Sequence, residues 1–309
     1  MNVLSRERQV AAISALCEGV SIRATERLTG VNRGTVMSLG VSVGEGCLNL
    51  HNAMMRRLRV NRIELDEIWS YVGKKQKRVR DDEGDMVGDQ YTFIALADTA
   101  KAIITYRTGK RTSDNTQVFA DDLRARVLGS PEISTDGFNA YPWCIAHAFG
   151  ENVAHGIVGK HYAVNGSPEA ARRYSPGQVV KVTRNVARGV PTHISTSYVE
   201  RQNLTLRMSQ RRFTRLTNGF SKTYLNHCAA VALYVAHYNL CRVHEALLIT
   251  PAMQLGVTDH IWTISELVEA ALRYVPPASP HSPARASKSP TKSAGPKAMR
   301  FQVIQGGKK

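Results

Sequence analysis

The feature that most constrains this chain is a run of three strand patterns that begins at Arg62. Residues 62–69 alternate between apolar and polar side chains, which is the period of a strand with two different faces. Residues 90–98 and 102–107 are rich in β-branched and aromatic side chains, with a tight turn at Thr99–Lys101 between them. The sequence therefore predicts an α/β sheet that starts with three consecutive strands.

Helix and strand patterns alternate after these strands. They are a helix over 113–129, a strand over 132–135, a short helix over 141–149, a strand over about 154–158, a helix from Ser195 through Arg211 and a helix over 221–238. This order is that of the ribonuclease H-like fold, so we predict such a catalytic core over residues 61–250. Residues 163–190 are rich in Gly, Pro and Arg and are predicted to be a loop insertion.

The N-terminal residues carry helical patterns only. Apolar spacing predicts helices over 6–18 and 21–30, and Asn32 is predicted to cap a third helix. Short helices with a glycine-bearing turn before the third are typical of a helix-turn-helix, although a plain three-helix cap is the alternative. We predict an all-α, helix-turn-helix DNA-binding domain over 1–45, followed by a linker over 46–60, although the pattern over 44–60 also fits a continuing helix.

In a helix-turn-helix, the start of the third helix faces the bases of the major groove. The side chains predicted to lie at that start, and therefore to contact DNA, are Asn32, Arg33 and Thr35.

The charge of the chain favours a polyanionic partner. Formal net charge is +16, which points to nucleic acid first and to an anionic membrane surface second. Seven of the 41 Lys and Arg residues fall in 276–309, where no acid occurs, so the remaining chain is also basic. We predict that 251–275 closes the folded part and that 276–309 is a disordered basic tail.

Cysteines and hydropathy exclude several classes of protein. The five cysteines are widely spaced and odd in number, so neither a zinc site nor a disulfide framework is expected. They are predicted to be reduced core residues of a cytosolic protein. No signal peptide or stretch of about 18 apolar residues is present, so no membrane association is expected.

Three carboxylates are placed to converge in the predicted sheet. Asp66 lies within the first strand, Asp136 closes the fourth, and Glu200 lies near the start of the late helix. The first and fourth strands are neighbours in this topology, and the late helix packs across their ends. Three like charges would repel without cations, so the cluster implies two Mg²⁺ ions, with Mn²⁺ able to substitute. The alternative is that each acid is a solvated surface residue.

Two further features bear on this site. Glu64 should share a strand face with Asp66, whereas Glu67 should point the other way. On the late helix, Glu200 shares a face with three residues predicted to hold DNA phosphates, because their spacing is three or four. These residues are Asn203, Arg207 and Arg211.

Four segments together are similar to those of one enzyme family. They are Asp66-Glu-Ile-Trp-Ser-Tyr, Ser134-Thr-Asp136-Gly with Tyr141, Ser195 through Glu200 to Lys222, and residues 237–244 with 250–262. The family they resemble is the DDE transposases of bacterial insertion elements, of the type named insertion sequence one. The resemblance covers roughly residues 4–270.

The resemblance implies a metal-dependent polynucleotidyl transferase that cuts and joins DNA at the ends of a mobile element. Asp66, Asp136 and Glu200 would be its metal ligands, and the N-terminal helices would bind the terminal inverted repeats. Some members carry an N-terminal zinc module, for which this chain lacks the cysteines. The implied partners are element ends and target double-stranded DNA, bound by a homodimer or larger assembly in the bacterial cytoplasm, at the nucleoid.

Two other functions remain open on the sequence. One is a structure-selective nuclease of the same fold, and the other is a DNA-binding regulator that has lost catalysis.

Overall fold

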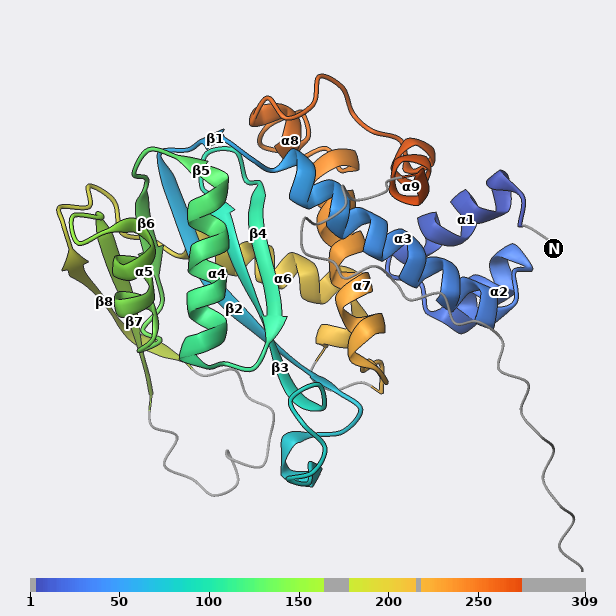
Figure 1. Ribbon diagram of the computed structural model, residues 1–309, viewed down its shortest axis with the longest axis horizontal. Coiled ribbons are helices and arrows are strands. Elements are labelled where there is room, and N and C mark those ends of the chain that lie inside the picture. The colour runs from blue at the N-terminus through green and yellow to red at the C-terminus, as the bar shows by residue number, and fades with distance from the viewer. Residues whose placement is uncertain (1–3, 164–177, 215–217, 274–309) are drawn as a thin grey trace, which may run out of the picture. The chain divides into compact units, whose positions relative to one another are not determined.

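The computed structural model describes residues 4–163, 178–214 and 218–273, so the predicted tail over 276–309 lies outside the described residues. They form a mixed α/β structure, shown in Figure 1. Its strands are β1 Leu58–Arg59, β2 Arg62–Val72, β3 Gly88–Ala97, β4 Ile103–Gly109, β5 Val127–Leu128, β6 Glu132–Thr135, β7 His155–Tyr162 and β8 Val179–Arg188. Its α-helices are α1 Arg6–Cys17, α2 Ile22–Thr29, α3 Arg33–Met54, α4 Ser113–Arg126, α5 Tyr141–Phe149, α6 Ser197–Ser209, α7 Tyr224–Ala236, α8 Pro251–Gln254 and α9 Ile264–Arg273.

The described residues contain one sheet of six strands, in the order β4-β3-β2-β6-β7-β8. Strand β3 is antiparallel to both β2 and β4, β6 is parallel to both β2 and β7, and β8 is antiparallel to β7. The predicted run of three strands is confirmed, as is the expectation that the first strand of the sheet neighbours the fourth. Strands β1 and β5 pair separately.

Side chains of β2 alternate between two buried clusters. Leu65 packs in the cluster that contains Phe119 of α4, which covers one face of the sheet together with α5. Ile68 packs on the other face, in the cluster that contains Leu206 of α6 and Val231 of α7. Figure 1 shows α4 and α5 on the near side of the sheet. The alternation fixes which helix each side chain of β2 meets.

Helix α3 corrects the predicted boundary between the first two regions. It runs without a break from Arg33 to Met54, so the third helix is long rather than short and most of the predicted linker over 46–60 is helical. Its buried residues pack with α1, α7 and α9 in one cluster. The N-terminal helices therefore share a core with the C-terminal helices, and a boundary at residue 45 would fall inside α3.

Glycines explain how α3 packs so closely. A methyl group added at Gly44 would lie 2.3 Å from the carbonyl oxygen of Ala229 in α7, and one at Gly46 would lie 2.0 Å from that of Ala271 in α9. Glycine weakens an isolated helix by about 1 kcal/mol relative to alanine, but here it permits backbone contact on two sides. Tertiary packing thus supports a helix that local propensity alone would shorten.

Strand β8 corrects the predicted loop insertion over 163–190. Residues 164–177 lie outside the described residues, but Val179–Arg188 pairs with β7 along its length, and β7 itself extends to Tyr162. The Gly, Pro and Arg content of the whole stretch concealed this β-branched segment. The sheet therefore has one more strand than predicted.

The late helices follow the predicted order with shifted ends. Helix α6 ends at Ser209, because Gln210 adopts an extended backbone, and α7 is followed by a π-helical turn over His237–Cys241. In that turn, the buried side chain of Asn239 accepts from the N–H of Ile103 at 3.0 Å and donates to its carbonyl at 2.8 Å. Asn239 thus satisfies both backbone groups of Ile103 at the first residue of β4. No helix in the described part of the chain is long and apolar enough to cross a membrane.

Candidate metal centre

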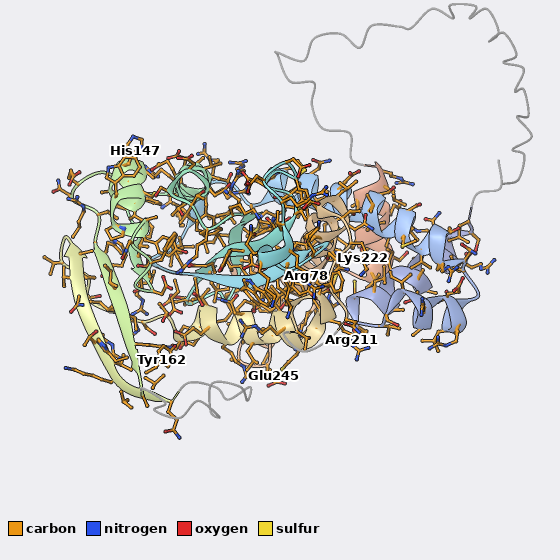
Figure 2. All side chains as sticks on the ribbon, turned by 90° about the horizontal axis from the view of Figure 1, so that it is seen from below. Arg78, His147, Tyr162, Arg211, Lys222 and Glu245 are labelled. Atoms are coloured by element: carbon orange, nitrogen blue, oxygen red, sulfur yellow. The ribbon has the colours of Figure 1, made fainter. Side chains whose placement is uncertain are left out.

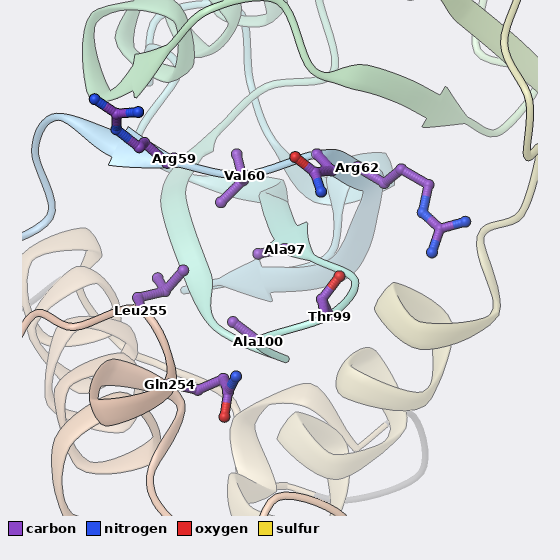
Figure 3. A pocket seen from close by; sticks show the side chains of 9 residues that line it. Arg59, Val60, Arg62, Ala97, Thr99, Ala100, Gln254 and Leu255 are labelled. Atoms are coloured by element: carbon purple, nitrogen blue, oxygen red, sulfur yellow. The ribbon is translucent and has the colours of Figure 1, made fainter.

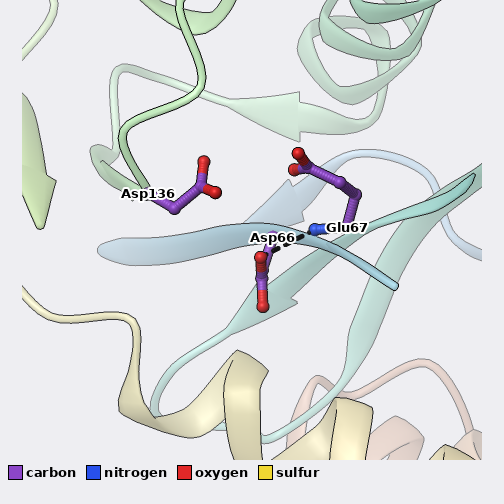
Figure 4. A group of neighbouring side chains, drawn as sticks. All are labelled: Asp66, Glu67 and Asp136. Carbon is purple, nitrogen blue, oxygen red and sulfur yellow. Dashed lines mark hydrogen bonds between the residues drawn. The ribbon is translucent and has the colours of Figure 1, made fainter. Parts of the chain in front are cut away.

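The central strands bring Asp66 and Asp136 together. Strands β2 and β6 are parallel, with Leu65 beside Thr135, and Asp66 and Asp136 are the residues that follow in each chain segment. Glu67 completes the group, since one carboxylate oxygen from each of the three acids lies within 4.8 Å of the others. Figure 4 shows these side chains around the end of β6. The group could hold a metal ion.

The Asp66 carboxylate is largely buried and has two neutral donors. The N–H of Glu67 donates to Oδ1 at 2.9 Å, and the Asn203 amide of α6 donates to Oδ2 at 2.8 Å. Burial raises the pKa of Asp66 to about 7, and the charges of Asp136 and Glu67 add to the increase. Among the ion pairs formed by the described residues, those of this site involve Glu67, Asp136 and Glu200, and none involves Asp66.

Glu67 enters the group from the opposite face of β2. Its Oε2 accepts from the Tyr141 hydroxyl of α5 at 2.9 Å, and its Oε1 accepts from the Arg111 guanidinium. The expectation that Glu67 and Asp66 point to different faces is confirmed by these contacts. Burial raises the pKa of Glu67, followed by repulsion from Asp136.

Arg111 joins two of the acids. It contacts Glu67 and lies 3.6 Å from Oδ2 of Asp136, while its guanidinium stacks over the Phe138 ring at 4.1 Å from the centroid. Oδ1 of Asp136 accepts from the N–H of Phe138 at 3.0 Å, which forms the turn after β6. Burial raises the pKa of Asp136, and the charge of Glu200 also acts in that direction.

The start of α6 is fixed by Glu64 of β2. Its buried carboxylate accepts from the N–H groups of Tyr198 and Val199 at 2.8 and 2.9 Å. A carboxylate at a helix N-terminus satisfies free donors and complements the helix dipole. Glu64 shares the α6 face of β2 with Asp66, as predicted, and it anchors the helix turn that carries Glu200.

Glu200 is not part of the group of three acids. Its Oε2 accepts from the Lys160 ammonium of β7, and its Oε1 accepts from the Thr196 hydroxyl at 2.6 Å. Both oxygens therefore bond within the chain. The structure brings Asp66 and Asp136 together, while Glu200 lies nearby with a different set of partners.

The residues predicted on the Glu200 face have three different environments. Asn203 is buried at 5% exposure and serves Asp66 rather than facing solvent, and Arg207 is half-buried. Arg211 lies beyond the end of α6, in a short 3-10 turn over Arg211–Phe213, so the prediction of one continuous helix face to that residue is wrong. Figure 2 shows Arg211 near the end of α6, far from Tyr162 of β7.

The residues predicted to read DNA lie at the exposed start of α3. Asn32 caps the helix, as expected, with its side-chain oxygen accepting from the N–H of Gly34 at 2.8 Å. Arg33 and Thr35 are exposed, and the N–H of Arg33 donates to Glu26 of α2 at 2.8 Å. The two helices are connected through Gly30, which adopts φ 65°.

A cavity of about 160 Å³ lies away from the acids, at the start of β2 and the β3–β4 turn. Figure 3 shows Arg59, Arg62 and Thr99 among its lining side chains, none of which is acidic. The candidate functional site is therefore the group of carboxylates and not this cavity.

The acidic group offers oxygen ligands only, which is the donor set preferred by Mg²⁺ and Mn²⁺. Sequence reasoning missed Glu67, Arg111 and Lys160 as members or partners of the site. Glu67 could have been found from its position next to Asp66, and Tyr141 from its place in the second matched segment. No sequence signal links Arg111 or Lys160 to the acids, because both contacts depend on the folded sheet.

No protein-family model matches the chain, and a search of curated proteins finds no significant match.

Proposed function

We propose that this chain is a DDE-type transposase that binds the ends of a mobile DNA element and catalyses metal-dependent strand cleavage and strand transfer. The observation that carries the proposal is the adjacency of Asp66 and Asp136 on parallel central strands, beneath the helix that bears Glu200. The ribonuclease H-like fold requires this arrangement of its first strand, fourth strand and late helix.

The chemistry of the acids supports a divalent cation. Asp66 is buried beside two other carboxylates, and its raised pKa, about 7, measures how unfavourable its charge is there. A divalent cation would remove that penalty. Asp66 and Asp136 would hold one ion, and Asp66 and Glu200 a second, and ions so placed supply nucleophile activation and charge neutralisation in phosphoryl transfer.

Other residues would orient these acids. Asn203 holds Asp66 from the α6 side, and Tyr141 holds Glu67 from the α5 side. Glu64 fixes the first turn of α6, so the direction of Glu200 depends on β2. Such partners set the geometry of metal ligands and contribute about 10- to 100-fold in metal affinity.

DNA binding would use separate basic surfaces. The exposed start of α3, with Asn32, Arg33 and Thr35, is proposed to read the terminal repeats as the second helix of a helix-turn-helix. Arg207 and Arg211 are proposed to hold phosphates along α6 and beyond its end. Two ends must be joined in one reaction, so we expect at least a dimer on DNA in the cytoplasm.

The test is strand cleavage of plasmid DNA carrying the ends that flank the gene, in Mg²⁺ or Mn²⁺. The wild-type chain is expected to cut at the ends and to join them to target DNA. Asp66→Asn should bind the ends normally and lose cleavage, and so should Asp136→Asn.

Three other outcomes are informative. Cleavage without joined products would favour a nuclease of the same fold. End binding without cleavage by the wild type would favour a regulator. Normal cleavage by Asp66→Asn would reject the assigned site.

A further inference from the structure

Lys160 occupies the carboxylate that the proposed mechanism assigns to a metal ion. Its ammonium and the Thr196 hydroxyl together bond both oxygens of Glu200. The Lys160 and Glu200 side chains are 29% and 36% exposed, so the pair lies at the open side of the site rather than in the core. A divalent cation bound at Oε2 of Glu200 would lie next to the Lys160 ammonium, so the two cations would repel and compete for this carboxylate.

The sheet aims Lys160 at this position. Lys160 lies opposite Val182 in the β7–β8 pair, and its contact with Glu200 places it on the α6 face. The neighbouring pair joins His161 to Lys181, and alternation puts both on the opposite face. Of the two lysines Lys160 and Lys181 in this strand pair, only Lys160 therefore faces the proposed site.

We propose that Lys160 is a positioning residue that holds Glu200 before metal binding and passes to a DNA phosphate when Glu200 turns to the metal ion. This inference rests on the proposed function. Its effect is an exchange of partners, in which one ammonium and one divalent cation compete for the same carboxylate.

The strength of the pair makes such an exchange feasible. Partly exposed ion pairs change an equilibrium by no more than about fivefold, so a divalent cation can displace the ammonium. Lysine is suited to the second step because its flexible stem carries a compact charge that binds phosphate from many directions. A released Lys160 would stand beside the scissile region, where charge increases during phosphoryl transfer.

The test uses Lys160→Met in the full chain, with Mn²⁺ alone as the probe and titration followed by electron paramagnetic resonance. Methionine keeps much of the length and removes the charge. We expect Mn²⁺ affinity at the weaker site to rise about fivefold, since the competitor is absent. Structural damage caused by the substitution would weaken Mn²⁺ binding. An increase in Mn²⁺ affinity therefore shows that the competing ammonium was removed and that the site was not damaged. Lys160→Arg should restore affinity close to the wild-type value.

Two matched variants exclude a general effect of charge. Lys181→Met removes the same charge from the adjacent strand but on the other face, and should leave Mn²⁺ affinity unchanged. In a Glu200→Gln background, Lys160→Met should give no increase, because the competition needs the carboxylate. Unchanged or weaker binding in Lys160→Met, or an equal increase in either control, would overturn the proposal.

Asp66→Asn separates this inference from the proposed function. If wild-type Mn²⁺ binding is absent, or survives in Asp66→Asn, the proposed metal site fails and the Lys160 proposal fails with it. If Asp66→Asn abolishes binding while Lys160→Met does not tighten it, the site stands and only the Lys160 proposal is lost.

Discussion

Asp66 and Asp136 extend from adjacent strands, whereas Glu200 extends from a helix that packs across them. Burial raises the pKa of both strand carboxylates, and the Asp136 side chain is 35% exposed, close to the 36% of Glu200. Glu200 is partly exposed and is bonded by Lys160 and Thr196. In the strand half, Arg111 offsets the charges of Asp136 and Glu67, whereas Asp66 has two neutral donors. In the helix half, Glu200 has Lys160 as its counter-ion.

We therefore expect the strand acids, Asp66 and Asp136, to respond to a metal ion differently from the helix acid, Glu200. Strands fix their side chains through the sheet register, so Asp66 and Asp136 lie close together before any ion binds. The helix half must first exchange a partner. We therefore expect the strand half to determine metal affinity and the helix half to determine whether bound metal is used.

The largest expected effect is on metal affinity. Asp66→Asn should weaken Mn²⁺ binding by about 100-fold or more, because even outer partners of a metal contribute up to about that much. Glu200→Gln should change the tighter site by less than about threefold, since its carboxylate has other partners. Calorimetric titration of both variants with Mn²⁺ measures the difference. Equal losses would show that the halves act as one unit.

The next effect is the dependence of metal binding on pH. A protonated Asp66 cannot ligate a cation, and its pKa is about 7. Mn²⁺ affinity should therefore be constant above that pH and fall by about tenfold per pH unit below it. Glu200→Gln should keep the same midpoint. A midpoint near 4, the ordinary range of an aspartate, would contradict the buried and repulsive environment assigned to Asp66.

The free energy of unfolding should also depend on the buried environment of Asp66, with a smaller effect than that on metal binding. The pKa of Asp66 is higher in the folded state, so its contribution is fully present at low pH and is lost as pH rises through about 7. Without metal, Asp66→Asn should therefore unfold with a free energy about 1–3 kcal/mol higher than the wild type at pH 8. The gain should vanish near pH 4, and urea unfolding at the two pH values measures it.

Buried histidines provide an internal check on that measurement. Burial lowers the pKa of His227 and of His51 to about 3. The wild type and Asp66→Asn should therefore both lose stability as pH falls below about 6.5. This trend has the opposite sign to that of Asp66 and cancels in the difference between variants. A stability gain that persists at pH 4 would have another cause.

Sequence alone predicted the strand half better than the helix half, for physical reasons. The alternation around Asp66 and the end of the strand at Asp136 are local patterns, and parallel strand pairing follows from their order. The partners of Glu200 depend instead on β7 and β8, and β8 was predicted as loop. Lys160 and Glu200 are 40 residues apart, with no shared periodicity.

The N-terminal helices repeat this lesson. Gly44 and Gly46 predict a weak helix locally, yet α3 continues through both because α7 and α9 approach its backbone there. The residue pattern within one helix does not indicate which distant helices will pack against it in the folded protein. For that reason the predicted linker begins too early, since α3 extends to Met54 and the alternative of a continuing helix holds up to that residue. The cap at Asn32 is a local interaction and was confirmed.

The smallest expected effect concerns Asn203, the side chain of α6 that joins the two halves. Its amide donates to Oδ2 of Asp66 at 2.8 Å and stabilises the charged carboxylate. Asn203→Ala should therefore raise the pKa of Asp66, and the pH midpoint of Mn²⁺ binding should rise by up to about one unit. Arg207→Ala, one turn further along the same helix, is the matched control and should leave the midpoint unchanged. If Asn203→Ala leaves the midpoint in place while weakening metal binding, the amide acts by packing α6 against β2, and the two halves are coupled through shape rather than through this hydrogen bond.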